Sequence, residues 1–219
     1  GVVNPAVGFN PCPYDAGYYH LEPGPIAICS QTRMTNPQAF PYLDLTCGVS
    51  KICDLGNKSD VDECDLLPYL GEDEQTRVIS LYVESVRDGR RFMQAAREVT
   101  PKKPVLILKL GRTEAGAKAS ASHTGSMAVN HRIFEAAAHQ AGLLWLDKFR
   151  ELFEVPKIFA SQPLPNGNRL AIMSYTGAVG VLATDESPRY GLRPARASEG
   201  TRAALEDLFP GLGTIPIDI

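Results

Sequence analysis

The chain has 219 residues, of which 44% are hydrophobic and 21% are charged, and this composition excludes a disordered tail and a fibre. Because 22 Lys and Arg residues face 25 Asp and Glu residues, there is no excess positive charge to neutralise a phosphate backbone, so nucleic acid is not an expected partner. The five cysteines are never spaced as C-x-x-C, which argues against a zinc knuckle, and no apolar run approaches the roughly 20 residues of a membrane helix, so we expect a cytoplasmic protein without a membrane partner.

The first residues of the chain favour turns over regular structure. Residues 1–25 hold many Gly, Pro and Tyr residues, and we expect a lead-in segment there rather than a domain. From residue 26 onward, short apolar runs alternate with amphipathic stretches. The apolar runs predict buried strands at residues 26–29, 49–53, 78–83, 105–108 and 143–146. The amphipathic stretches predict helices at residues 60–70, with Ser59 or Asp60 as N-cap, at 88–99 and at 130–141.

This alternation of strand and helix predicts an α/β fold with a doubly wound, mainly parallel sheet. We expect it to span residues 26–162, because the Pro- and Asn-rich stretch at 163–168 interrupts the pattern. A new strand is predicted at 169–174, followed by a helix after Gly180 that Pro188 should kink or shorten. Residues 163–219 are too few for a whole second domain of this kind, so we expect the start of one.

Ligands of open α/β sheets bind in the loops that follow the strands, and one such loop is unusually long. Residues 111–130 separate a predicted strand from its helix, whereas connections of this kind usually have about 2–6 residues. His123 lies at the centre of this stretch, next to Ser122 and Thr124. A neutral imidazole is a competent nucleophile toward phosphoryl groups, although a solvated loop histidine explains the same pattern.

Phosphoryl transfer through a histidine needs a group that holds the far ring nitrogen and a group that binds the anion. Glu84 follows the strand at 78–83 and suits the first role, although it also suits the first turn of a helix. The turn from Gly177 to Gly180 suits the second role, because a helix N-terminus attracts anions, although close packing explains these glycines equally well.

Other candidate sites fall away. Asp60, Asp62 and Asp65 lack the ligand pattern of a calcium loop and are expected in the first turn of a helix. No Glu or Cys completes metal-ligand spacing around His131 and His139, so we expect a structural or surface role for both and no metal site.

Several longer strings give the chain a family resemblance. In order, they are DLGNKSDVD at 54–62, LYVE at 81–84 with DGRRF at 88–92, KLGRTEAG at 109–116 running into SHTGS at 122–126, and GVLATD at 180–185. Together they resemble the nucleoside-diphosphate-forming acyl-CoA synthetases, relatives of succinyl-CoA synthetase, over most of the chain from about residue 26. The resemblance implies flavodoxin-like ligase domains.

In that family acyl-CoA, phosphate and ADP give a free acid, CoA and ATP through an acyl phosphate and a phosphohistidine. The resemblance implies that His123 carries the phosphate, that Glu84 steadies it, and that Mg²⁺, ATP or ADP, and CoA serve the complete enzyme. The residues expected to bind phosphate are Ser30, Gln31, Thr32, Thr124, Gly125, Thr176, Gly177 and Ala178.

The resemblance also implies partners for this chain. A CoA-binding domain and an ATP-grasp module, on the same or a separate chain, complete the family's enzymes, and neither is visible here, so we expect the chain to be cut at both ends. We also expect an oligomer and a small carboxylic acid or its CoA ester as substrate, of unassigned acyl group.

One departure from the family leaves an alternative open. Arg33 stands where the family has Gly after Ser-Gln-Thr, and it adds bulk and charge at a tight turn. The chain would then be a non-catalytic flavodoxin-like module that binds a nucleotide or a partner, with a degenerate phosphate loop. A flavin-binding flavodoxin is a further alternative.

Overall fold

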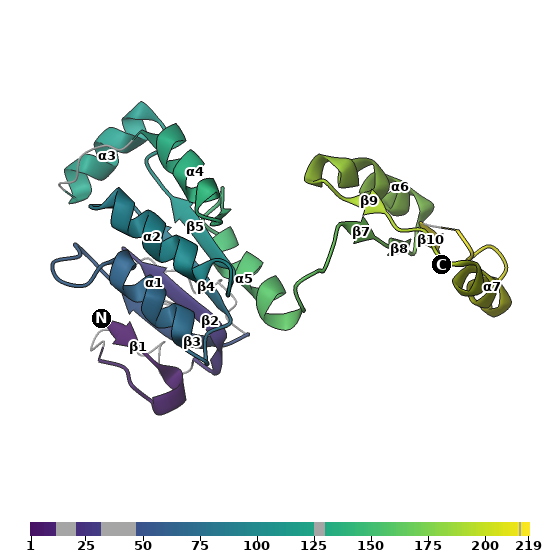
Figure 1. The fold of residues 1–219 in the computed structure, drawn as a ribbon, viewed down its shortest axis with the longest axis horizontal. Coiled ribbons are helices and arrows are strands. Elements are labelled where there is room, and N and C mark those ends of the chain that lie inside the picture. Colours follow the sequence, from purple (N-terminus) through teal and green to yellow (C-terminus); the bar gives the residue numbers. More distant parts are fainter. Residues whose placement is uncertain (12–20, 32–46, 125–129, 215) are drawn as a thin grey trace. The chain divides into compact units, whose positions relative to one another are not determined.

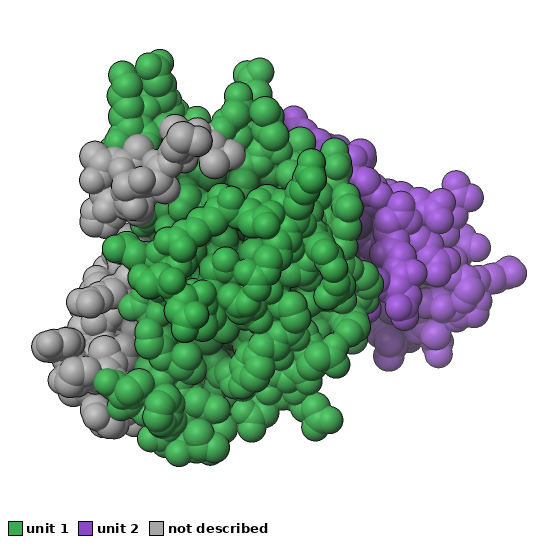
Figure 2. All heavy atoms as spheres, turned by 60° about the vertical axis from the view of Figure 1, so that its left-hand side comes forward, with its two compact units in different colours: residues 1–163 green, residues 164–219 purple. Residues whose placement is uncertain are grey.

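The computed structural model describes residues 1–11, 21–31, 47–124, 130–214 and 216–219, with the side chains of residues 120–124 outside that description. The chain divides into two compact units, residues 1–163 and 164–219, which Figure 2 shows in different colours. Each unit is described by itself below. In the described residues, no helix is long and apolar enough to cross a membrane.

Unit 1 is built on a twisted, mainly parallel sheet, which confirms the predicted α/β class. Within the described residues the strand order is β1-β3-β2-β4-β5-β6, and every neighbouring pair is parallel except β1 with β3 (Figure 1). The strands are β1 (Val2–Val3), β2 (Pro23–Ser30), β3 (Val49–Asp54), β4 (Val78–Val83), β5 (Val105–Lys109) and β6 (Leu144–Trp145).

Helices cover both faces of this sheet, because successive side chains of a strand point to opposite faces and both sets are apolar here. Helices α1 (Glu63–Glu72), α2 (Gly89–Val99) and α4 (His131–Gln140) pack on the face that carries Ala27 and Cys29. Helix α5 (Glu151–Ser161) packs on the face that carries Ile26 and Ile28 (Figure 1). Fully buried strands explain the continuous apolar runs of the sequence.

Two helix starts show how local chemistry sets the boundaries. Asp88, the first residue of the helix predicted at 88–99, is the N-cap of α2. Its side chain accepts hydrogen bonds from two backbone N–H groups at 3.0 Å. The predicted cap of α1 at Ser59 or Asp60 is wrong, because α1 starts at Glu63 after the N-cap Asp62. Asp62 and Asp65 form a reciprocal capping box there, which satisfies backbone donors at both positions.

The predicted long loop at 111–130 is also wrong in part, because residues Glu114–Thr124 form helix α3. Alternate alanines in this stretch favour helix, and the Thr113 hydroxyl accepts the backbone N–H of Gly116 at 3.1 Å, in the manner of an N-cap. His123 therefore stands in the last turn of a helix rather than in a loop.

The segment predicted as a lead-in contributes to the sheet. Val2 and Val3 pair antiparallel with Cys53 and Ile52 of β3, and β2 begins at Pro23, earlier than the predicted strand. Gly24 makes this early start possible, since a Cβ at this position would lie 2.2 Å from the carbonyl oxygen of Cys47. The short η1 (Pro5–Val7) follows β1.

Unit 2 is smaller, and its described residues form two parallel strand pairs. Strand β7 (Arg169–Leu170) pairs with β9 (Arg193–Pro194), and β8 (Met173–Ser174) pairs with β10 (Ile217–Asp218). The predicted strand at 169–174 is thus two strands. Helix α6 (Gly177–Glu186) ends before Pro188, which lies in the 3₁₀ turn η4 (Ser187–Tyr190), so the predicted shortening of this helix is confirmed. Helix α7 (Glu199–Leu208) follows.

Candidate functional site

The carboxyl ends of the parallel strands in unit 1 bring four polar positions to one edge of the sheet. Ser30 lies beside Asp54 at the ends of β2 and β3, and Lys109 lies beside Val83 at the ends of β5 and β4. Glu84 follows β4 directly. Open α/β sheets bind their ligands at this edge, so two of the predicted site residues, Ser30 and Glu84, lie where a ligand is expected.

Gln31 ties the loop after β2 to the loop after β4. Its side-chain oxygen accepts hydrogen bonds from the backbone N–H groups of Glu84 at 2.8 Å and Ser85 at 3.0 Å. Its side-chain nitrogen donates to the Ser85 hydroxyl at 3.1 Å, and its own backbone N–H donates to the Tyr82 carbonyl. The buried amide of Gln31 thus fixes the backbone at Glu84, a role that the sequence did not indicate.

The Glu84 carboxylate is half-buried and has the Tyr82 phenol as a hydrogen-bond partner. The Tyr82 hydroxyl donates to one of its oxygens at 3.0 Å, and burial, followed by the Glu84 charge, raises the Tyr82 pKa well above its usual range. Burial lowers the pKa of Lys109, and the negative charge of Glu84 partly opposes that shift. A carboxylate held in this way is well suited to orient an imidazole.

The structure describes the predicted nucleophile only through its backbone. His123 and Thr124 occupy the end of α3, and their side chains lie outside the described residues, as do Thr32, Arg33 and Gly125 altogether. Ser30 and Gln31 are brought to the same edge as Glu84. Whether the His123 imidazole meets Glu84 therefore stays a prediction.

The predicted phosphate-binding residues Thr176, Gly177 and Ala178 open helix α6 in unit 2. Thr176 is its N-cap, and the Thr176 hydroxyl accepts from the Val179 N–H at 3.4 Å. The first N–H groups of a helix have no partner inside it, so they are available to an anion. A Cβ on Gly177 would lie 3.1 Å from a carboxylate oxygen of Asp218, so this helix end already has an acid beside it, which the sequence did not indicate.

Lys58 and Glu63 form a buried ion pair that sequence reasoning missed. The Lys58 ammonium lies 2.7 Å from a Glu63 oxygen, and both side chains are 1% exposed. The same ammonium donates to the Ser85 carbonyl at 2.5 Å, beside Glu84. A lysine in a polar turn gives no signal of burial, because its partners lie in α1 and in the loop after β4.

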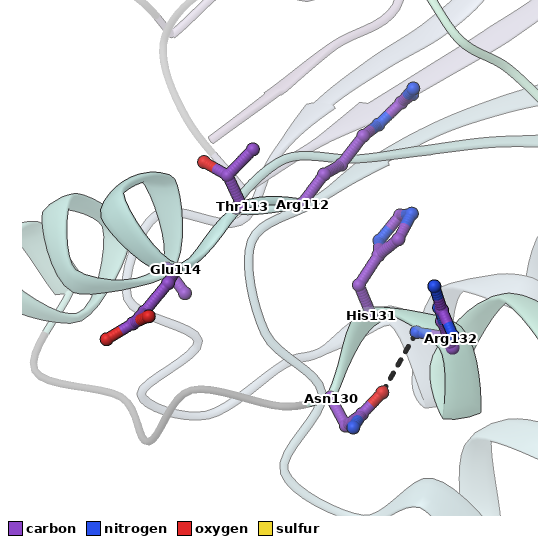
Figure 3. Close-up of a pocket in the computed structure, with 8 residues that line it drawn as sticks. Arg112, Thr113, Glu114, Asn130, His131 and Arg132 are labelled. Atoms are coloured by element: carbon purple, nitrogen blue, oxygen red, sulfur yellow. Dashed lines mark hydrogen bonds between the residues drawn. The ribbon is translucent and has the colours of Figure 1, made fainter.

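A pocket of about 600 Å³ opens where α3 and α4 begin (Figure 3). Arg112 contributes to its wall and is paired with Asp147 at 2.8 Å. His131 packs its ring against Trp145 at 5.4 Å, burial lowers its pKa, and its Nδ1 has no hydrogen-bond partner in the described part of the chain. These contacts agree with the structural role predicted for His131. The lining residues are Gly111, Arg112, Thr113, Glu114, Ala117, Asn130, His131 and Arg132.

The described residues contain no group of three or more His, Cys, Asp or Glu side chains that could hold a metal ion. The described cysteines, Cys29, Cys47, Cys53 and Cys64, are free thiols.

Comparisons with known proteins agree on one family. The family model described as the succinyl-CoA ligase like flavodoxin domain matches residues 23–159. The alpha subunit of acetate–CoA ligase [ADP-forming] II of Pyrococcus furiosus is 42% identical over 174 residues, which are 78% of this chain and 38% of that subunit. Acetate–CoA ligase [ADP-forming] of Methanocaldococcus jannaschii is 39% identical over 177 residues, 80% of this chain and 25% of that protein.

The solved structures give the same answer. Dinucleotide forming acetyl-coenzyme A synthetase 1 of Ca. Korarchaeum cryptofilum, in complex with phosphate and ADP, has a TM-score of 0.83 and 33% identity. The match covers 91% of this chain and 44% of that one. The chain thus spans less than half the length of these relatives.

Proposed function

The chain belongs to the family of succinyl-CoA ligase-like flavodoxin domains, and we propose that it is the phosphohistidine-bearing core of an ADP-forming acyl-CoA synthetase. The complete enzyme converts acyl-CoA, phosphate and ADP to the free acid, CoA and ATP. In the first step, phosphate displaces CoA from the acyl carbon and gives an acyl phosphate. This chain acts in the steps that follow.

His123 then carries the phosphoryl group between two sites. One imidazole nitrogen attacks the phosphorus of the acyl phosphate, the bond from phosphorus to the acyl oxygen breaks, and the carboxylate leaves. The terminal oxygen of ADP takes the phosphoryl group from the histidine and gives ATP. The N–H group of the other ring nitrogen donates a hydrogen bond to the Glu84 carboxylate. This bond holds the imidazole ring and stabilises the positive charge that develops on it.

The observation that carries this proposal is the fixed carboxylate at the carboxyl edge of the sheet. Glu84 stands at the end of β4, its backbone is held by Gln31, and its carboxylate is held by Tyr82. His123 lies within the same matched span, residues 23–159. An orienting acid of this kind suits phosphoryl transfer through a histidine, because that chemistry depends on positioning and on charge stabilisation.

Anion binding falls to helix ends in this proposal. The N–H groups of Gly177 and Ala178, which follow the N-cap Thr176, donate to the phosphoryl oxygens at the start of α6. The turn at Ser30 to Thr32 serves as a second such site, with Thr124 and Gly125 beside the histidine. In this proposal Mg²⁺ enters with the nucleotide on the ATP-grasp module.

The remaining parts of the enzyme lie beyond this sequence in the proposal. A CoA-binding domain and an ATP-grasp module complete it, on the same chain or on a second one, and a small carboxylic acid or its CoA ester is the substrate. The P. furiosus relative named above is an alpha subunit, so its name supports the arrangement in which the remaining parts lie on a second kind of chain.

The proposal is tested on the complete enzyme with Mg²⁺ and γ-labelled ATP. We expect an acid-labile, base-stable label on this chain that is lost in His123→Ala and is kept in His139→Ala, a control whose side chain is 58% exposed on α4. Full ligase activity in His123→Ala would refute the proposal. Tight binding of a CoA ester or nucleotide without any label, in an enzyme whose ATP-grasp module is active, would favour the alternative of a binding module with a degenerate phosphate loop at Arg33.

A further inference from the structure

The string at residues 54–62 resembles the family but has no task in the proposed function, and its structure is unusual. Lys58 has a φ of 54°, in the left-handed region that residues other than Gly rarely adopt. Its side chain is also 1% exposed. A strained backbone and a buried charge each cost free energy. Such features persist only where the surrounding structure stabilises them, and they cluster at functional sites.

The contacts of Lys58 lead to the loop that carries Glu84. Its ammonium lies 2.7 Å from the Glu63 carboxylate in the first turn of α1, which neutralises the charge inside the protein. The same ammonium donates to the Ser85 carbonyl at 2.5 Å. An ammonium group is a strong donor, so this bond fixes the peptide that follows Ser85.

The other side of the same loop is held by Gln31. Its oxygen accepts from the N–H groups of Glu84 and Ser85, and its nitrogen donates to the Ser85 hydroxyl. Lys58 and Gln31 therefore hold the backbone of Ser85 through its carbonyl and its N–H. A further link joins the two loops, since Arg87 donates to the Asn57 carbonyl at 2.9 Å.

We propose that the buried Lys58–Glu63 pair is a positioning device for Glu84, which it fixes through the backbone of Ser85 in the orientation that phosphoryl transfer through His123 requires. This inference rests on the proposed function and assigns a task to the motif at 54–62. Buried ion pairs seldom add net stability compared with apolar residues of the same size, and in some proteins they serve to fix one geometry. Catalysis is sensitive to displacements of about 1 Å, so a fixed loop matters here.

The chain supplies a matched control in a second ion pair. Lys51 of β3 lies 2.5 Å from Asp73, with side chains 5% and 15% exposed. Asp73 is the C-cap of α1, whereas Glu63 is its first residue, so the two pairs stand at opposite ends of the same helix. Loss of the Lys58 ammonium leaves the buried Glu63 carboxylate without its ion-pair partner. Loss of the Lys51 ammonium removes the partner of Asp73, which is partly buried and keeps a hydrogen bond from the Thr76 hydroxyl at 2.6 Å. Of the two lysines, only Lys58 reaches the loop of Glu84.

The experiment compares Lys58→Met, Lys51→Met and the double variant Lys58→Met with Glu63→Leu in the complete enzyme. Methionine is unbranched and only one heavy atom shorter than lysine, so it nearly fills the same space and adds no branch at a positive φ. Four quantities are measured: the thermal midpoint, the single-turnover rate of His123 phosphorylation, the KM of the ligase reaction, and the amide exchange of the peptide that contains Glu84 and Ser85.

We expect both single variants to lower the thermal midpoint, but only Lys58→Met to slow phosphorylation, by about 10- to 100-fold, with KM within about twofold of wild type. Only Lys58→Met should speed the exchange of the peptide around Glu84. The double variant should recover the midpoint, because no unpaired charge remains, and should stay slow.

Equal phosphorylation rates in Lys58→Met and Lys51→Met would overturn the inference, and so would a double variant that recovers the rate together with the midpoint. Absence of label on His123 in wild type is a different failure. It would remove the proposed function and, with it, this role of the pair.

Discussion

The substitution Gln31→Leu tests how the loop of Glu84 is held. Leucine keeps the approximate volume of the side chain but removes the acceptor of two backbone N–H groups and the donor to the Ser85 hydroxyl. We expect the free energy of unfolding of unit 1 to fall and amide exchange at Glu84 and Ser85 to rise, because the loop loses its link to the end of β2.

The magnitude follows from the burial of each group. The hydrogen bond at the Ser85 N–H is buried, so this donor is left unsatisfied, which costs about 1–3 kcal/mol. The Glu84 N–H is only partly buried and can turn to water, and the lost bond to the Ser85 hydroxyl adds about 1 kcal/mol. The sum is about 2–4 kcal/mol, whereas Ser85→Ala removes only the last contribution.

Urea unfolding followed by tryptophan fluorescence measures this loss, because Trp145, the single tryptophan of the chain, lies in β6 of unit 1. Gln94→Leu on the exposed side of α2 is the control, expected within about 0.5 kcal/mol of wild type. The reasoning is refuted if Gln31→Leu costs no more than Ser85→Ala or Gln94→Leu.

Three further substitutions test separate parts of the structure. Gly24→Ala forces a Cβ against the Cys47 carbonyl, so we expect a loss of more than about 2 kcal/mol in urea unfolding; an unchanged midpoint would mean that β2 does not start at Pro23. The backbone hydrogen bond from Asp62 lowers the pKa of Asp65, so the stability that Asp65 adds is present above its usual pKa and is lost as pH falls through the lowered value. Asp65→Asn should therefore make the decline of the thermal midpoint below about pH 4 shallower. An identical decline in Asp65→Asn and wild type would contradict this. Thr176→Val removes the N-cap of α6 and should cost about 1 kcal/mol in thermal unfolding of unit 2, whereas Thr176→Ser should cost little; equal losses in the two would count against the cap.

Much of the fold of unit 1 could be predicted because its strands are buried on both faces. The apolar run at 78–83 matches β4 residue for residue. The helix predicted at 88–99 from apolar spacing agrees with α2, which starts one residue later, after its N-cap Asp88. Helix α3 was missed because Ser122, His123 and the glycine after Thr124 look like a loop, while the alanines before them favour helix. Strand β1 has two residues and no periodicity to detect.

The candidate site was predictable only as chemistry, not as geometry. Glu84 follows from its place after a buried strand, and His123 follows from its hydroxyl-rich surroundings. The roles of Gln31 and Lys58 depend on loops that come together only when β2, β3 and β4 pair in register. The burial of Lys58 could not be predicted from its residue type, because lysine is almost never fully buried without a partner.

The measurement that tests the central claim most directly is mapping of the phosphoryl group by mass spectrometry. The complete enzyme is incubated with Mg²⁺ and ATP, quenched in base, digested and sequenced, with a second sample chased with ADP before the quench. We expect the phosphoryl group on His123 in the first sample and its loss in the chased sample. A phosphoryl group on another residue, or none on an enzyme that turns over, would contradict the assignment of His123.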